Sequence, residues 1–261
     1  MAQKLPLKDF QMLSAMEVPM YGWRARIGFV SPPLMTEMVP YEFYQMVPEG
    51  VGLLVTCMGL DDLTAEQMDQ ALGTVQRHIG EQNRRGVDYV VLGGTPLILS
   101  RGIGFEQELL SQVQTLSSVP ITTTTHTAVA ALRSLGVKRL ASLTTYHPWR
   151  NELLSAFLSA QGFEVLAVEG FASHIADIHT ITPETVFREG KHLLLHHPRA
   201  EAIYIPCAQL HTWPVIQRLE KECSVPVVTS TLSWVWSALK HLKIHAPPHA
   251  QTMLWQGTVQ P

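Results

Sequence analysis

Cysteine is scarce in this chain of 261 residues, and no disulfide framework can be built from it. The three cysteines, Cys57, Cys207 and Cys223, are odd in number and far apart, a pattern that suits a reducing compartment. No stretch reaches about 18 uninterrupted apolar residues, and the first ten residues lack the apolar core of a signal peptide. These absences predict a soluble cytoplasmic protein.

Charged residues are also few, at 16% of the chain, and the formal net charge is −3. Lysine and arginine form no cluster, whereas nucleic-acid and anionic-membrane surfaces require one. We therefore expect neither a nucleic acid nor a membrane as a partner. The length and the 46% hydrophobic content suffice for one large or two small α/β domains with a full core. The sequence leaves open whether the chain forms a homo-oligomer.

Several motifs of cofactor-dependent or hydrolytic enzymes are absent as well. There is no phosphate loop, and Gly102 and Gly104 resemble half of a dinucleotide fingerprint but follow no predicted strand. The twelve histidines include no H-E-x-x-H and the cysteines no C-x-x-C, so we expect no metal site. The chain also lacks the G-x-S-x-G turn of serine hydrolases.

What the chain does contain is an internal repeat. Residues 26–33 and 87–95 have counterparts 113 positions later, at 139–146 and 200–208, and residues 118–125 have one 106 positions later, at 224–231. The repeat predicts two pseudo-symmetric Rossmann-like α/β domains, each with a mainly parallel sheet flanked by helices. We assign an N-terminal arm to residues 1–25, a first half to 26–120 joined by the C-terminal segment 226–261, and a second half to 121–225.

Cys207 follows a short apolar strand predicted at 202–205. Ligands of open α/β sheets bind outside the carboxyl ends of strands, which favours a chemical role, although a lone cysteine there is more often a small core residue. Gly94 corresponds to Cys207 in the repeat, so facing halves would place the two on opposite walls of one cleft. Thr95 then lies beside the first and Ala208 beside the second. Thr95 offers a hydroxyl and an N–H to a carboxylate oxygen.

Three further residues stand near the ends of predicted strands. Pro33 closes a Ser-Pro-Pro exit loop that cannot continue the strand at 26–30, and this loop either lines a pocket or is a plain turn. Thr125 is the last of four threonines before a predicted helix, where hydroxyls serve as a helix cap, as anion donors or as both. Tyr146 is equivalent to Pro33 in the repeat and either donates a hydrogen bond to a substrate or only packs.

Four segments together resemble the aspartate/glutamate racemase superfamily: 94–102, 119–139, Thr145-Tyr146 with Asn151-Glu152, and 205–207 with 225–230. Within it, the chain is most similar to the arylmalonate decarboxylases and next to the maleate cis-trans isomerases, over residues 26–240. The resemblance implies two Rossmann-like domains with the active site in the cleft between them. It also implies a small carboxylate or dicarboxylate substrate and no cofactor.

The racemases and isomerases of the superfamily carry one cysteine on each wall, whereas here the first position corresponds to Gly94 and only Cys207 remains. Moving a proton between the faces of a carbon needs two acids, while decarboxylation needs one acid on one face. The resemblance makes Cys207 the proton donor to an enediolate, held in an anion hole by Thr95, Tyr146 and N–H groups near Cys207. The first hypothesis is therefore a cofactor-independent carboxy-lyase of an α-substituted (aryl)malonate.

The chain departs from the decarboxylase pattern at two places, and two alternatives stay open. Pro96 stands where the decarboxylases have serine, and Ala208-Gln209 where they have glycines. One alternative is a maleate cis-trans isomerase or an amino-acid or hydantoin-type racemase, in which His126, His211 or water replaces the missing acid. The other is a non-catalytic binder of small carboxylates.

Overall fold

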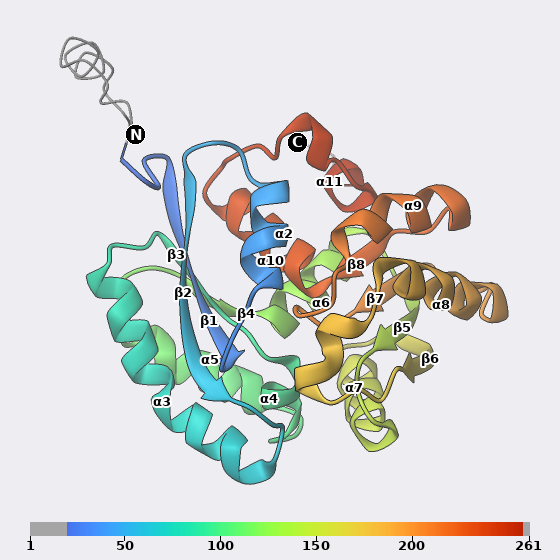
Figure 1. Cartoon of the computed structure of the whole chain (residues 1–261), viewed down its shortest axis with the longest axis horizontal. Helices are drawn as coiled ribbons and strands as arrows, with labels where there is room; N and C mark the ends of the chain where they lie inside the picture. Colours follow the sequence, from blue (N-terminus) through green and yellow to red (C-terminus); the bar gives the residue numbers. More distant parts are fainter. Residues whose placement is uncertain (1–19, 258–261) are drawn as a thin grey trace, which may run out of the picture.

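Two parallel sheets of four strands organise residues 20–257, the part of the chain that this computed structural model describes (Figure 1). The first sheet has the order β2-β1-β3-β4, with strands Val51–Leu60, Ala25–Pro33, Tyr89–Leu92 and Ile121–Thr123. The second has the order β6-β5-β7-β8, with strands Glu164–Gly170, Arg139–Thr144, Ala202–Ile205 and Val227–Thr229. The shared order confirms the two similar α/β halves predicted from the repeat.

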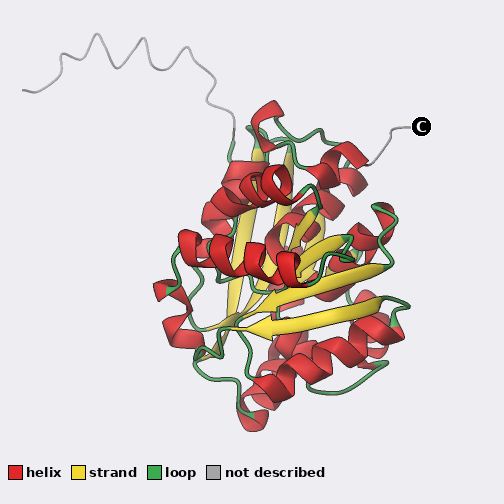
Figure 2. Ribbon diagram, turned by 90° about the vertical axis from the view of Figure 1, so that its right-hand side faces the viewer, coloured by secondary structure: helices red, strands yellow, loops and turns green. Residues whose placement is uncertain are grey.

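Helices cover both faces of each sheet, so the inner strands are apolar without alternation. All four residues of β3 and all four of β7 are buried, as expected for parallel strands covered on both faces. On β1, Ile27 and Phe29 belong to the core that includes α2 (Met38–Met46), whereas Val30 packs into the core beside α3 (Ala65–Arg84). Figure 2 shows the strands as inner layers with the helices outside them.

Threonine hydroxyls cap several helices, which is why these helices begin where the strands end. Thr123 caps α6 (Thr124–Ser134) and Thr229 caps α10 (Ser230–His241), each accepting a backbone N–H three residues later, at 2.9 and 3.2 Å. The remaining helices are α4 (Thr95–Leu99), α5 (Phe105–Gln114), α7 (Pro148–Ala160), α8 (Pro183–His196), α9 (Trp213–Cys223), α11 (Met253–Gly257) and the 3-10 helices η1 (Ile175–Thr180) and η2 (Pro248–Ala250). None of the helices described is long and apolar enough to cross a membrane.

The two sheets extend past the expected boundaries at residues 120 and 225. Strand β4 pairs with β3, and β8 pairs with β7, so each one completes the sheet that precedes it in the chain. The following helices connect the halves, because α10 packs against both α6 and α2. Trp234 of α10 stacks on Phe43 of α2, with ring centroids 5.6 Å apart. The C-terminal segment therefore contributes its strand to the second half and contacts the first half through its helix.

The first strand also differs from its expected extent. It continues to Pro33, which pairs with Leu60 of β2 after a register shift, instead of ending in an exit loop at Ser31. On the other side of β1, pairing with β3 stops at Val30, so the two prolines stand at a local sheet edge, where a missing N–H is tolerated. Residues 1–19 of the expected N-terminal arm lie outside the described residues.

Candidate active site

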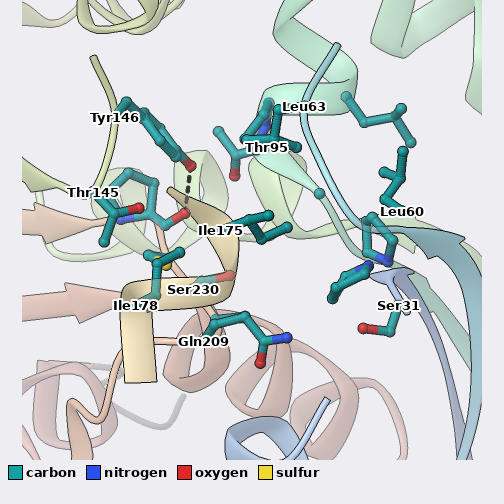
Figure 3. A pocket seen from close by; sticks show the side chains of 18 of the residues that line it. Ser31, Leu60, Leu63, Thr95, Thr145, Tyr146, Ile175, Ile178, Gln209 and Ser230 are labelled. Carbon is teal, nitrogen blue, oxygen red and sulfur yellow. Dashed lines mark hydrogen bonds between the residues drawn. The ribbon is translucent and has the colours of Figure 1, made fainter. Parts of the chain in front are cut away.

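The carboxyl ends of both sheets meet at one cavity between the halves, as expected for ligand sites of parallel sheets (Figure 3). The first half contributes the last residues of β1 and β2 and residues that follow β3, and the second half contributes residues that follow β5 and β7. The lining includes Pro32, Pro33, Leu60, Gly94 and Thr95 from the first half, and Thr145, Tyr146, Cys207, Ala208 and Gln209 from the second.

Cys207 lies two residues beyond the end of β7 and is 8% exposed. Burial raises the pKa of its thiol above the usual value, and the nearby Glu42 carboxylate adds to this effect. Hydrogen bonds from the Thr145 hydroxyl and from the N–H groups of Gln209 and Leu210 oppose the rise. The raised pKa keeps the thiol protonated at neutral pH, the state that a proton donor requires.

Gly94 occupies the position in the first half that corresponds to Cys207. It has a φ of +103°, and a Cβ atom there would lie 2.5 Å from Cγ of Pro32 and 3.2 Å from Cβ of Leu97. A side chain at this position would therefore be strained and would also displace Pro32. The cavity is asymmetric at its two corresponding positions, with a thiol on one wall and no room for a side chain on the other.

Thr95 and Tyr146 face the same cavity from opposite halves (Figure 3). The Tyr146 hydroxyl donates a hydrogen bond of 2.7 Å to the carbonyl of Pro206, the residue before Cys207. Burial raises the pKa of Tyr146 well above its usual value. The buried Thr95 hydroxyl lies near the phenols of Tyr146 and Tyr204 but makes no hydrogen bond of ordinary length to a described residue.

The structure brings together all but one of the site residues singled out in the sequence. Gly94, Thr95, Tyr146, Cys207, Ala208 and Pro33 all line the cavity. Thr125 does not, because its hydroxyl is buried against the Glu106 carboxylate of α5 and lies 3.1 Å from the Thr123 hydroxyl. Its position at a helix start made it a candidate anion donor, but its hydroxyl donates its hydrogen bond to Glu106 instead of to a ligand.

Comparisons with known proteins agree with this architecture. A profile of the arylmalonate decarboxylase family matches residues 27–255. The chain belongs to the arylmalonate decarboxylase family. Among its curated relatives, the arylmalonate decarboxylase of Bordetella bronchiseptica is 28% identical over 219 residues, which cover 82% of this chain and 89% of that protein. A maleate isomerase of Alcaligenes faecalis is 22% identical over 152 residues, which cover 56% of this chain and 59% of that protein.

Solved structures of arylmalonate decarboxylase and of maleate isomerase share the two-domain fold of this family member. A liganded double mutant of arylmalonate decarboxylase aligns with a TM-score of 0.82 at 25% identity, covering 88% of this chain and 98% of that one. A variant of the maleate isomerase Iso from Pseudomonas putida S16, crystallised with maleate, aligns with a TM-score of 0.82 at 20% identity and covers 90% and 98%. The predicted superfamily is thus confirmed, and the chain belongs to a family of enzymes.

Gln209 gives this member of the arylmalonate decarboxylase family a polar contact across the cleft. Its amide nitrogen donates to the carbonyl of Met35 at 2.9 Å, and the Thr36 hydroxyl donates to its amide oxygen at 3.2 Å. In Figure 3 the side chain extends from the Cys207 loop toward the strand that carries Ser31. Gln209 therefore connects the loop that bears the thiol to the segment after β1.

Glu42 makes a second connection between the halves that the sequence analysis missed. Its carboxylate, on α2, accepts hydrogen bonds from the backbone N–H groups of Thr212 and Trp213 at 2.5 and 2.7 Å, and from the Thr212 hydroxyl at 3.0 Å. The carboxylate thus accepts hydrogen bonds from N–H groups at the start of α9, which have no partner within the helix. Burial raises the pKa of Glu42 to about 7, although these hydrogen bonds act to lower it. The sequence did contain an indication of this buried contact, because Glu42 is an acidic residue on the otherwise apolar helix face formed by Val39, Phe43 and Met46.

Arg150 is also a cavity residue that the sequence analysis missed. It lies in the first turn of α7 and is 5% exposed. Its Nη2 donates to the carbonyl of Leu63 at 3.2 Å, and the guanidinium lies 4.2 Å from the centre of the Trp149 ring. Nothing in the local sequence distinguishes this arginine from a solvent-exposed one on a helix surface.

Proposed function

We propose that this family member is a cofactor-independent decarboxylase of an α-substituted malonate, with Cys207 as the proton donor. The asymmetry of the cavity carries this proposal. Cys207 offers one acid from one wall, and the corresponding position, Gly94, has no room for a second. One acid on one face is what decarboxylation followed by protonation requires.

The proposed reaction balances with the side chains that the cavity holds. The bond between the α-carbon and one carboxylate breaks, CO2 leaves, and the bonding electron pair stays behind as an enediolate. The Thr95 hydroxyl and N–H groups beside Cys207 stabilise this charge, while Tyr146 orders the loop through the Pro206 carbonyl. The Cys207 thiol then gives its proton to the α-carbon, and the resulting thiolate regains a proton from solvent.

An apolar part of the cavity supports an aryl or alkyl substituent on the malonate. Leu60, Leu63, Ile175 and Ile178 line it, and Figure 3 shows Ile175 between Thr95 and the loop that carries Gln209. Apolar lining with a few polar groups is typical of sites that orient a small organic ligand. We therefore expect substituted malonates to react better than malonate itself.

Isomerisation is the competing reaction, and it would require a second acid. Neither His126 nor His211 is among the described residues that line the cavity, and His126 is exposed on α6. His211 makes an edge contact with the Tyr41 ring instead, with centroids 5.2 Å apart. Neither of the two candidate side chains for the missing acid lines the cavity of the thiol, which leaves only water for that role and favours decarboxylation.

Proton NMR with phenylmalonate, alkylmalonates and maleate tests the proposal. We expect loss of CO2 from the substituted malonates and no conversion of maleate to fumarate. The Cys207→Ala variant should turn over about 10²- to 10⁴-fold more slowly, the usual contribution of a general acid. Cys223→Ala, a matched control outside the cavity, should keep wild-type rates. Conversion of maleate, or no turnover of any malonate, would contradict the proposal.

A further inference from the structure

One positive charge stands in an otherwise uncharged cavity wall. Arg150 is the only Asp, Glu, Lys or Arg among the described residues that line the cavity. It also lines a groove on the outer side, together with Pro96 and Trp149, so its side chain separates the cavity from that groove. A charge at this place is unexpected beside leucine, isoleucine and proline side chains.

Within residues 20–257, Arg150 makes no ion pair. Burial lowers the pKa of its guanidinium, and Tyr146 and Asp62 oppose this effect. The Asp62 carboxylate itself lies 3.5 Å from Nε2 of His174 and accepts the Leu63 N–H at 2.6 Å. A guanidinium has five N–H donors, and the one protein hydrogen bond of Arg150 uses a single donor. The side chain is largely buried and keeps free donors beyond its bond to Leu63, so it can bind an anionic group of a ligand.

The charge lies on the Tyr146 side of the cavity. Arg150 is one of the groups that lower the pKa of the Tyr146 phenol, whereas the charged group that acts on the Cys207 thiol is Glu42. Arg150 also borders the outer groove, which Cys207 does not line, so the guanidinium stands at the end of the cavity that meets this groove. Leu63, whose carbonyl accepts the Arg150 hydrogen bond, also lines the cavity with its apolar neighbours.

The anion bound there must keep its charge during the reaction. A cation paired with the departing carboxylate would stabilise the substrate more than the transition state, because that group becomes neutral CO2. The retained carboxylate already has the Thr95 hydroxyl and the N–H groups near Cys207. We infer that Arg150 binds a third anionic group of the substrate, a carboxylate at the end of its α-substituent. The preferred substrates are malonates with an acidic aryl or alkyl substituent, an inference that rests on the proposed function.

Turnover of paired substrates tests this assignment. Wild-type protein should prefer (4-carboxyphenyl)malonate to phenylmalonate in kcat/KM. Arg150→Met should lower kcat/KM for the acidic substrate by about 10- to 100-fold, mainly through KM, because charge-assisted hydrogen bonds are lost. Phenylmalonate should stay within about threefold of the wild-type value. Equal losses for both substrates, or no loss, would overturn the inference.

Arg101→Met is the matched control. Arg101 lines the outer groove but not the cavity, and it pairs with Asp69 at the surface. This variant should leave both substrates unchanged. Arg150→Lys keeps the charge but not the planar set of donors, so its kcat/KM for the acidic substrate should lie between those of the wild type and Arg150→Met. If Arg150→Met does not fold, as judged by thermal unfolding, the lysine variant provides the test, and equal values for both substrates would refute the role.

Direct binding separates this inference from the proposed function. Isothermal titration calorimetry with 4-carboxyphenylacetate and phenylacetate, which have no second malonate carboxylate to lose, should show about 10- to 100-fold tighter binding of the acidic ligand. The preference should disappear in Arg150→Met. Selective binding without any turnover would retain the role of Arg150 and reject the decarboxylase. Turnover without selectivity would reject the role of Arg150 alone.

Discussion

Replacing Glu42 by glutamine tests how the buried carboxylate between the halves affects stability. Burial raises its pKa from the usual 4.5 to about 7, even though Thr212 and Trp213 donate hydrogen bonds to it. The difference between the two pKa values corresponds to about 3 kcal/mol, by which folding disfavours the ionised form. Glutamine keeps an oxygen for the same donors and has no charge to bury.

The sign of the pH dependence follows from proton binding. Between pH 4.5 and about 7 the folded state holds a proton on Glu42 that the unfolded state has released. The free energy of unfolding should therefore fall as pH rises through this window, by about 3 kcal/mol in total, and then level off above pH 7. This contribution is fully present below pH 4.5 and should be missing from Glu42→Gln.

Urea unfolding of the wild type and of Glu42→Gln, measured from pH 4.5 to 8, gives the difference directly. The stability of the variant relative to the wild type should increase as pH rises. Glu152→Gln, at an exposed position on α7, is the matched control, and its free energy of unfolding should change with pH as that of the wild type does. Parallel curves for Glu42→Gln and the wild type would refute the account of a buried, protonated carboxylate.

Three further substitutions test individual contacts of the cavity. Gly94→Ala should destabilise the protein by about 1 to 3 kcal/mol more than Gly104→Ala, since both glycines have positive φ but only a methyl at Gly94 meets another side chain; equal losses in urea unfolding would contradict the clash. Tyr146→Phe should lose about 1 kcal/mol of stability with its hydrogen bond to the Cys207 loop, and a loss near zero in the same assay would argue against that bond. Gln209→Ala should speed alkylation of Cys207 by iodoacetamide, followed by peptide mass spectrometry, because its side chain spans the cleft; an unchanged rate would show that it does not restrict access.

The repeat predicted the fold well because it reflects buried strands in equivalent places. The strand of residues 89–92 and that of residues 202–205 are separated by the offset of 113 read from the sequence. The extent of β1 was not predictable in the same way, because proline is tolerated at Pro33 only where the neighbouring strand β3 has already ended. Local sequence indicates where a strand can run, and the neighbouring strand decides where it stops.

Some of the cavity residues were predictable from the sequence and others were not. Those that directly follow strands, such as Thr95 and Cys207, were predictable because parallel strands place their carboxyl ends at one edge. Glu42 was not, since its partner Thr212 lies 170 positions away and belongs to the other half. Arg150 was missed because its contact with Leu63 spans 87 positions and crosses the cleft.

The proton-donor role of Cys207 is tested most directly by decarboxylation of a prochiral arylmethylmalonate in D2O. Wild-type protein and the control Cys223→Ala should give a single enantiomer of the α-deuterated product, seen by NMR and chiral chromatography. Cys207→Ala should be about 10²- to 10⁴-fold slower, and any residual product should be racemic, because no acid remains on one face. A Cys207→Ala variant that forms the same enantiomer at the wild-type rate would contradict the account.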